Sequence, residues 1–425
     1  MTDPKSETEI VTFGCRLNTY ESEVMRQHAR DAGLENTIIF NTCAVTAEAE
    51  RQARQSIRKA RRDNPDARII VTGCAAQINP DSFASMDEVD RVLGNEEKLK
   101  AESFGIHETA RVAVNDIMEI EETAAHLVHG FEEHTRAFVQ IQQGCNHRCT
   151  FCIIPYGRGN NRSVPIGAIT EQVRELVSNG VQEVVFTGVD ITDYGLDLPG
   201  TPTLGQMTRR VLALVPELPR LRLSSIDPVE IDEDVYQLLA EEPRLMPHLH
   251  ISLQAGDDMV LKRMKRRHLR NDVETMVRRA RALRPDVVFG ADIIAGFPTE
   301  DDTMFRNSLN LVRDLDLTYL HVFPYSPRPG TPAAKMPQVP GPTRKARAAS
   351  LREAGQEAEN RFYQSLIGKD VEVLMEKGNF GRCQHYAPIA VEDCEETEKL
   401  RGTIVSARVT GFKDGKLTAL RNPSA

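Results

Sequence analysis

The chain has 425 residues, more than one hydrophobic core normally holds, which predicts two or three domains. No apolar run approaches the length of a membrane span, and the polar start MTDPKSETEI lacks the apolar stretch of a signal peptide, so we expect a cytoplasmic protein with no membrane partner. A net charge of −9 argues against wholesale binding of nucleic acid, although local basic patches could still contact it. Eight cysteines in such a chain favour metal ligands or reactive thiols over disulfides.

The first hundred residues alternate short apolar stretches with helical patterns, which predicts a parallel α/β sheet. Three of the predicted strands end at or just before a cysteine, namely Cys15, Cys43 and Cys74. Because ligands bind at the carboxyl ends of parallel strands, we expect these thiols to converge on one cluster site with three protein ligands. The alternative is that each is a small buried hydrophobic residue, which explains one such position more readily than three.

Two basic runs are candidates for contact with an RNA backbone. One lies along one face of a predicted helix at 51–62, and the other, at 262–270, contains no acidic residue. A solvated charged face is the alternative for both runs, and the overall negative charge favours it. The candidate residues are Arg51, Arg54, Arg58, Arg62, Lys262, Arg266 and Arg267.

The segment GCNHRCTFCIIPYGRG at 144–159 places Cys145, Cys149 and Cys152 in a C-x3-C-x2-C run just after a short apolar strand. An iron–sulfur cube takes four protein ligands, so three thiolates leave one iron open to a substrate. The alternatives are a structural zinc site with His147 as the fourth ligand, or three unrelated buried cysteines. Zinc sites usually join two separated cysteine pairs, and this chain has no suitable second pair.

From about 136 to 326, six apolar strands alternate with helical stretches, which predicts a partial (β/α)6 barrel. Its open side would admit a large substrate such as a folded RNA or a protein loop. Polar residues at the strand ends are candidates for holding a cofactor, as is Arg158 in the cysteine loop, although such residues are often only helix caps. The strand-end candidates are Thr187, Gly188, Asp190, Ser225, Gln254 and Asp292.

The C-terminal part begins with seven prolines between 324 and 342, which predict a linker or an ordered wrap, followed by a helix from near Thr343. Residues from about 368 to 421 have an entirely β pattern, with an Asp414-Gly415 turn typical of a hairpin. This pattern predicts a small barrel of a type that often binds oligonucleotides, but its equal numbers of basic and acidic residues do not by themselves indicate RNA binding. Cys383 and Cys394 are expected to be incidental thiols.

Taken together, these segments resemble the methylthiotransferase family of the radical S-adenosylmethionine (SAM) superfamily. The resemblance covers almost the whole chain and implies an α/β protein with an N-terminal cluster domain at 1–105, a linker at 106–135, a radical SAM barrel at 136–342, a connecting helix at 343–367 and a TRAM barrel at 368–425. The motifs that carry it are GCRLNTYESE at 14–23, NTCAVT at 41–46, TGCAAQ at 72–77, the 144–159 loop, GFPTE at 296–300 and YSPRPGTPAA at 325–334.

The resemblance also implies SAM, two 4Fe-4S clusters and a catalytic role for all six cysteines. The cluster on Cys145, Cys149 and Cys152 would cleave SAM to a radical that removes hydrogen from adenine C2. The cluster on the three N-terminal cysteines would carry the sulfur that is inserted. The implied partners are a tRNA substrate, an electron donor of flavodoxin or ferredoxin type and a sulfur source.

The GCRLNTYE and NTCAVT motifs most resemble the branch that acts on N6-threonylcarbamoyladenosine beside the tRNA anticodon. The isopentenyladenosine branch typically has an arginine-bearing segment where this chain has Val45 and Thr46, and the branch that modifies a ribosomal protein aspartate usually has proline where this chain has Arg16. An alternative of a different class is a non-catalytic electron carrier or RNA-binding module. An electron carrier would gain nothing from two clusters that each lack one protein ligand. This chain departs from the family at Thr299, often glycine, and in the variable loop at 190–193.

Overall fold

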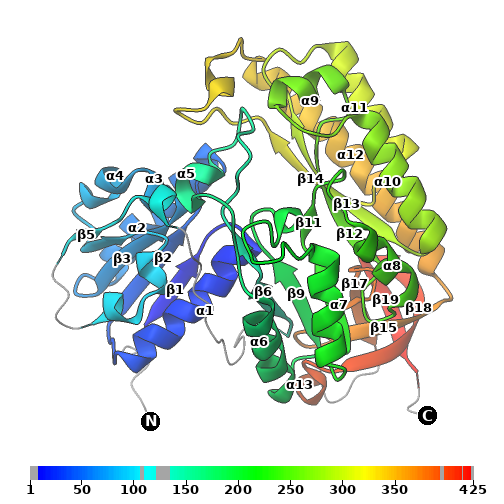
Figure 1. Ribbon diagram of the computed structural model, residues 1–425, viewed down its shortest axis with the longest axis horizontal. Helices are drawn as coiled ribbons and strands as arrows, with labels where there is room; N and C mark the ends of the chain where they lie inside the picture. The colour runs from blue at the N-terminus through cyan, green and yellow to red at the C-terminus, as the bar shows by residue number, and fades with distance from the viewer. Residues whose placement is uncertain (1–7, 106–109, 121–134, 393–396, 414, 423–425) are drawn as a thin grey trace.

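The computed structural model describes residues 8–105, 110–120, 135–392, 397–413 and 415–422. Most of the linker expected at 106–135 lies outside these residues, as do Cys394 and Asp414. In Figure 1 the N-terminal sheet lies on the left, the central strands follow in green and yellow, and the C-terminal strands lie at the lower right in red. Within the described part of the chain, no helix has the length and apolar composition that a membrane crossing requires.

The N-terminal part is a parallel five-stranded sheet in the order β1-β2-β3-β4-β5, as the alternating pattern predicted. Helix α2 begins after Thr46, whose hydroxyl accepts from the Ala49 N–H at 3.1 Å and so caps the helix. Strands β4 and β5 are too short for an alternating pattern to predict. The elements are β1 (Glu9–Thr12), α1 (Arg16–Asp31), β2 (Thr37–Thr42), α2 (Ala47–Asp63), β3 (Arg68–Gly73), α3 (Cys74–Ile78), α4 (Pro80–Ala84), β4 (Arg91–Leu93), η1 (Glu97–Leu99), η2 (Ala101–Phe104), β5 (Val112–Ala113) and η3 (Ile117–Glu119).

The central part is the predicted partial barrel. Its parallel strands form one sheet in the order β10-β9-β6 and another in the order β11-β12-β13-β14. One of the six predicted strands, the segment LRLSSI at 221–226, is divided at Ser224 into β10 and β11. The elements are β6 (Ala137–Gln140), β7 (Gln142–Gln143), α5 (Ile154–Arg158), β8 (Arg162–Ser163), α6 (Ile166–Ser178), β9 (Glu183–Thr187), η4 (Ile191–Asp193), α7 (Leu204–Leu214), β10 (Arg220–Leu223), β11 (Ser225–Ile226), α8 (Glu233–Glu241), β12 (His248–Gln254), α9 (Asp258–Met264), α10 (Arg270–Leu283), β13 (Val288–Ala295), α11 (Asp302–Asp314), β14 (Tyr319–Pro324) and η5 (Pro332–Lys335).

The strands of the partial barrel separate apolar from polar side chains. On β12, Leu249, Ile251 and Leu253 belong to the large hydrophobic core, whereas the alternate residues His248 and His250 contact polar or aromatic groups. This period of two is expected for a strand with helices on one face. The other face of β12 is therefore lined by polar and aromatic side chains.

The C-terminal part is a closed barrel of five strands in the order β15-β16-β17-β19-β18, which confirms the predicted small β barrel. The long helix α12 (Gly341–Leu366) precedes it and packs along β14 and β13. The short helix α13, between β17 and β18, was not predicted. The elements are β15 (Asp370–Met375), β16 (Phe380–Cys383), β17 (Pro388–Glu392), α13 (Thr397–Leu400), β18 (Ile404–Lys413) and β19 (Lys416–Arg421).

Tyr386 of the C-terminal barrel joins all three parts of the molecule. Its ring stacks on His248 with centroids 5.3 Å apart, and arginines from each part lie against it. Guanidinium carbons lie 5.6 Å from the ring centre for Arg16, 5.3 Å for Arg136 and 5.1 Å for Arg222. Burial alone would raise the pKa of Tyr386, but these cations lower it below its ordinary value.

Glu183 on β9 pairs with two of these arginines, Arg136 and Arg222, and lies near a third buried arginine, Arg220. Its Oε1 lies 2.8 Å from Arg136 Nε and 2.9 Å from Arg222 Nε, and Arg220 Nη1 lies 3.9 Å from Oε2. Arg136 also pairs with the C-terminal barrel, because its Nη2 lies 2.8 Å from Glu376 Oε1. Burial would raise the pKa of Glu183, but the arginines lower it to about 2, so the carboxylate is ionised in the folded protein.

This low pKa predicts a loss of stability in acid. Because the folded state binds the Glu183 proton less readily than the unfolded state, the contribution is complete above pH 4.5 and is lost as the pH falls toward about 2. The contribution is about 3 kcal/mol. We expect urea unfolding midpoints of the metal-free protein to fall steadily between pH 5 and pH 3, and a flat profile there would contradict the ionised Glu183.

Candidate functional site

The three N-terminal cysteines converge at the carboxyl end of the sheet. Cys15 occupies the N-cap position of α1, Cys43 follows β2, and Cys74 is the first residue of α3. Gly14 has φ +101° and approaches so closely that a Cβ there would lie 3.0 Å from Cys43 Sγ. Burial, then the neighbouring Cys74 and Cys15 thiols, raise the pKa of Cys43 to about 12. The fold therefore places the three thiols at one edge of the sheet, and their binding of one cluster stays a prediction.

Two asparagines of the motifs around these cysteines, Asn18 and Asn41, hold the neighbouring backbone in place. Asn18 donates from Nδ2 to the carbonyl oxygen of Phe13 at 2.6 Å and to that of Thr42 at 3.2 Å. Asn41 in turn donates to the Asn18 carbonyl at 2.9 Å. These bonds tie the strand end before Cys15 to the strand end before Cys43.

The cysteines of the 144–159 loop form a second site. Burial, then the Asp190 carboxylate and the other two thiols, raise the pKa of Cys145, and burial followed by Cys149 raises that of Cys152 to about 12. Arg266 lies beside this site, with Nη1 3.6 Å from Cys149 Sγ. The loop is held to α9, because the Thr150 N–H donates to the Met264 carbonyl at 3.0 Å.

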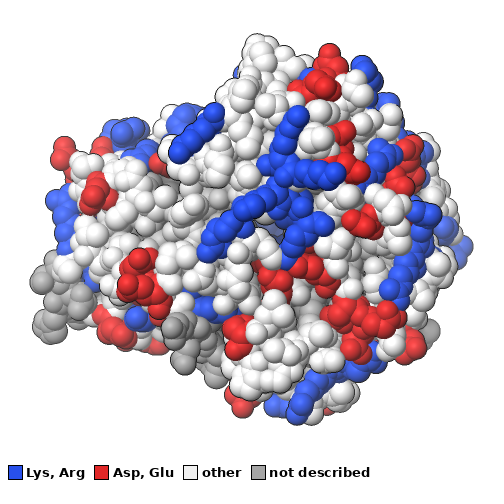
Figure 2. Space-filling model, turned by 45° about the horizontal axis from the view of Figure 1, so that its top comes forward, with Lys and Arg blue, Asp and Glu red and all other residues white. Residues whose placement is uncertain are grey.

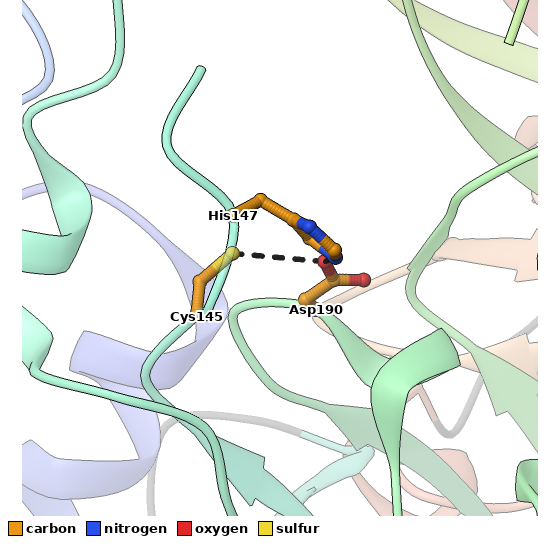
Figure 3. A group of neighbouring side chains, drawn as sticks. All are labelled: Cys145, His147 and Asp190. Carbon is orange, nitrogen blue, oxygen red and sulfur yellow. Dashed lines mark hydrogen bonds and ion pairs between the residues drawn. The ribbon is translucent and has the colours of Figure 1, made fainter. Parts of the chain in front are cut away.

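One side of this second site is acidic (Figure 3). Asp190 Oδ2 lies 3.7 Å from Cys145 Sγ and 3.4 Å from His147 Nε2. His147 Nε2 is also 2.8 Å from Asp193 Oδ2, and this contact raises the pKa of His147 above its ordinary value. The ligand atoms of Cys145, His147 and Asp190 lie within 4.8 Å of one another, a spacing that a metal ion could bridge, so the zinc alternative stays open. Burial, then Asp190 and Asp193, raise the pKa of Glu230 to about 7.

The structure distributes the strand-end candidates around the partial barrel. Asp190 lies beside a cysteine of the loop, Cys145. Asp292 instead lies between His250 Nε2 at 3.0 Å and His321 Nδ1 at 3.2 Å, and sequence reasoning did not identify either histidine. The others lie at the end of β9 (Thr187), directly after it (Gly188), on β11 (Ser225) and at the end of β12 (Gln254).

Three arginines of the α2 row contact other residues of the N-terminal part. Arg51 is exposed and pairs with Glu48, Arg54 lies over the Phe83 ring at 4.3 Å, and Arg58 is 3.9 Å from Glu88. Contact of these residues and of Arg62 with RNA stays a prediction.

Within the second run, Lys262 is exposed on α9, but Arg266 and Arg267 lie 2.7 Å and 3.1 Å from Asp227 Oδ2. Acidic residues from other strands thus neutralise a run that has none nearby in the sequence. Figure 2 shows Lys and Arg side chains gathered around a hollow near the centre of one face, with acidic side chains beside them. Contact of this run with RNA also stays a prediction.

Thr299 has φ +66°, a conformation that favours glycine, which accounts for the glycine that its motif often carries. Its hydroxyl is also buried without a hydrogen-bond partner among the described residues. We expect Thr299→Gly to raise the free energy of unfolding by about 1 kcal/mol. Thermal unfolding of the metal-free protein measures this, with Thr299→Ala as the control that removes the hydroxyl and the γ-methyl but keeps the Cβ. A lower midpoint for the glycine variant than for the alanine variant would contradict the strain.

The most buried charges near the N-terminal cysteines were not predicted from the sequence. Glu21 and Lys98 have fully buried side chains that form an ion pair of 2.6 Å. Arg158, expected to hold a cofactor, instead donates from Nε to Cys74 Sγ at 3.1 Å. The signal that could have identified Glu21 is its position on the covered face of α1, where a carboxylate needs a charged partner.

Comparison with known proteins defines the class. Residues 139–312 match the radical SAM superfamily, and residues 7–94 match an uncharacterized protein family, UPF0004. A solved radical SAM methyltransferase, TsrM from Kitasatospora setae, has the same fold over 77% of both chains, with a TM-score of 0.54 and 15% sequence identity. The fold and the cysteine loop are those of a radical SAM protein.

Curated relatives define the family. Threonylcarbamoyladenosine tRNA methylthiotransferase MtaB of Rickettsia prowazekii is 55% identical over 407 residues, which cover 96% of each chain. The protein of the same name from Aquifex aeolicus is 34% identical over 92% of this chain and 97% of its own. A tRNA-2-methylthio-N(6)-dimethylallyladenosine synthase of Maricaulis maris is 33% identical over 91% and 90%. The chain belongs to the radical SAM methylthiotransferase family and is of the MtaB type.

This superfamily implies a 4Fe-4S cluster and SAM, and the residues of the 144–159 loop fit them. Cys145, Cys149 and Cys152 are free thiols. Burial and mutual repulsion oppose three thiolates at this place, as the raised pKa values of Cys145 and Cys152 indicate. A cationic iron centre removes that penalty, because its ligands are bound in the deprotonated form. The three cysteines would hold the cluster.

Proposed function

We propose that this protein is a tRNA methylthiotransferase that adds a methylthio group at C2 of N6-threonylcarbamoyladenosine beside the anticodon. The observation that supports the proposal is the presence of two groups of three free cysteines, one at the strand ends of the N-terminal sheet and one in the 144–159 loop, in a chain with full-length relatives of that name. A single site would suit many radical SAM reactions. A second site offers a place for the sulfur that this reaction consumes.

At the first site, Cys145, Cys149 and Cys152 hold the cluster, and one ligand position is left for SAM. The bound cluster and SAM supply one-electron chemistry at an unactivated aromatic C–H bond, which no side chain provides. Asp190 lies beside Cys145, and Glu230 lies close to Asp190 and His147, so carboxyl groups gather on one side of the site, a suitable environment for the cationic amino group of SAM. The remaining strand-end candidates are proposed to orient SAM and the adenosine.

At the second site, Cys15, Cys43 and Cys74 are proposed to hold an auxiliary 4Fe-4S cluster, which supplies the sulfur when bound. Cys43 is buried, whereas Cys15 is exposed, so the site has both a protein-covered side and a side open to a donor. A flavodoxin or ferredoxin as reductant and a separate sulfur source complete the proposal. The reaction is proposed to take place in the cytoplasm.

Recognition of the tRNA is proposed to use the exposed basic residues of α2 and α9 together with the C-terminal barrel. The functional division would then be a cluster domain at 1–105, a radical SAM barrel at 136–342, the helix at 343–367 and a TRAM domain at 368–425. Arginines of the first two parts lie against Tyr386, so these contacts position the C-terminal barrel relative to both parts.

A reaction with purified components tests the proposal. The protein is reconstituted with iron and sulfide, reduced with dithionite, and given SAM and either of two tRNAs, one carrying threonylcarbamoyladenosine and one carrying isopentenyladenosine. Digestion and mass spectrometry should detect the methylthio product only with the first tRNA. A product only with the second would reject the substrate. SAM cleavage without product from either tRNA would direct attention to a ribosomal protein aspartate.

A further inference from the structure

A buried arginine of the cysteine loop reaches the other cysteine site. Helix α5 starts two residues after Cys152 and packs against α3, which begins at Cys74 (Figure 1). The helices are so close that a Cβ at Gly157 would lie 3.2 Å from Cys74 Cβ. The next residue, Arg158, is 1% exposed and donates from Nε to Cys74 Sγ across 3.1 Å. The short helix α5 therefore connects the loop that carries the cysteines of the first site to Cys74, a proposed ligand of the second.

Each nitrogen of the Arg158 guanidinium donates a hydrogen bond to a neighbouring side chain. Its Nη2 donates to Glu21 Oε2 at 2.9 Å and also to the side chain of Asn18, and its Nη1 donates to Glu21 Oε1 and, at 3.1 Å, to Gln143 Oε1. Glu21 is shared with Lys98, whose Nζ lies 2.6 Å from Oε2. The arginine cannot turn away from Cys74 without breaking these contacts.

This buried group contains two basic side chains and one carboxylate. Burial would raise the pKa of Glu21, but Arg158 and Lys98 lower it to about 2, so the carboxylate is ionised. The guanidinium is always protonated. Burial lowers the pKa of Lys98 while Glu21 opposes that shift, so one carboxylate serves two basic side chains, and the permanent charge of the Arg158 guanidinium lies beside Cys74. In a buried setting such a charge acts strongly on its neighbours.

We propose that Arg158 is a positioning residue that sets the reduction potential of the auxiliary cluster through Cys74. Hydrogen bonds to ligand sulfurs and the net charge around a cluster both determine its potential. An N–H donor and a fixed positive charge stabilise the more negative, reduced form, so both raise the potential. This inference rests on the proposed function, because it requires a cluster on Cys15, Cys43 and Cys74.

Redox titration of the auxiliary cluster alone tests the inference. The parent is the full-length chain with Cys145, Cys149 and Cys152 changed to alanine, reconstituted with iron and sulfide and titrated with dithionite while its electron paramagnetic resonance signal is recorded. We expect Arg158→Gln to shift the midpoint potential to a more negative value. Arg158→Lys, which keeps the charge but not the directed Nε–H, should shift it less.

Two further variants make the result specific. Glu21→Gln removes the negative charge and should shift the midpoint in the opposite direction, to a more positive value. Arg148→Gln is the matched control, because Arg148 is an exposed arginine of the same loop that donates to the Cys145 and His147 carbonyls and to the Asn160 side chain. It should leave the potential unchanged.

The outcomes separate the inference from the proposed function. If the parent binds iron and neither Arg158→Gln nor Glu21→Gln moves the midpoint, the inference is overturned and the auxiliary cluster stands. If Arg158→Gln fails to take up iron, the direction of the Glu21→Gln shift decides, and a negative or absent shift overturns the inference. A parent that binds no iron overturns the auxiliary cluster itself, and the inference with it.

Discussion

Cys149→Ala is expected to abolish SAM cleavage, whereas Cys43→Ala is expected to preserve cleavage and stop insertion of sulfur into tRNA. The first change removes one of three ligands from the loop site, and the second removes the buried ligand of the N-terminal site. The pKa of Cys43 is raised by Cys74 and Cys15, whereas that of Cys145 is raised by Cys152 and Cys149, so the thiols act within their own groups. Loss of SAM cleavage and loss of sulfur insertion should therefore be separable. Production of 5′-deoxyadenosine measures cleavage, and mass spectrometry of digested tRNA measures insertion.

Cys383→Ala is the matched control for both variants. Cys383 is a buried free cysteine in the core of the C-terminal barrel, and its substitution should leave cleavage and insertion at the levels of the unchanged protein. Cleavage at the background level is expected for Cys149→Ala. Cleavage that survives this change would reject the assignment of the loop as the SAM-cleaving site, and insertion that survives Cys43→Ala would reject the role of the N-terminal site.

Glu183→Gln is expected to have the largest effect on stability. Glu183 is the carboxylate partner of Arg136, Arg222 and Arg220, all of which are buried. Removing one member of a buried charged group leaves the others uncompensated, at a cost of about 3–5 kcal/mol. Arg136 and Arg222 also contact the C-terminal barrel, so the change should weaken the attachment of that barrel. Urea unfolding of the metal-free protein measures the loss.

Glu233→Gln is the control for this prediction. Glu233 pairs with Arg279 at 2.6 Å, but both side chains are largely exposed, and such pairs contribute no more than about 1 kcal/mol. Glu183→Gln should therefore lower the unfolding midpoint well below that of Glu233→Gln. Equal midpoints for the two variants would show that the buried arginines do not depend on Glu183.

The cysteine sites could be predicted from the sequence because local pattern places them. Cys15, Cys43 and Cys74 follow strands that pair in parallel, and parallel strands present their carboxyl ends at one edge. The partial barrel was predictable for the same reason, since six strands alternate with helices. The division of LRLSSI into two strands was not, because the break at Ser224 depends on how the two sheets meet rather than on the local pattern.

The charges that surround the sites could not be predicted, because their partners are distant in the sequence. Arg158 and Glu21 are 137 residues apart, and no local pattern links them. The run at 262–270 contains no acid, yet Arg266 lies 2.7 Å from Asp227, which another strand end supplies. A basic run in a sequence therefore gives the local charge, whereas the electrostatic environment depends on the tertiary fold.

The most direct test of the proposed function is a comparison of the nucleosides of total tRNA from a strain that lacks this gene and from its parent. Mass spectrometry should show loss of 2-methylthio-N6-threonylcarbamoyladenosine and a matching gain of N6-threonylcarbamoyladenosine, with the methylthio derivative of isopentenyladenosine unchanged. In a strain without a second copy of the gene, an unchanged profile would contradict the assignment of tRNA as the substrate.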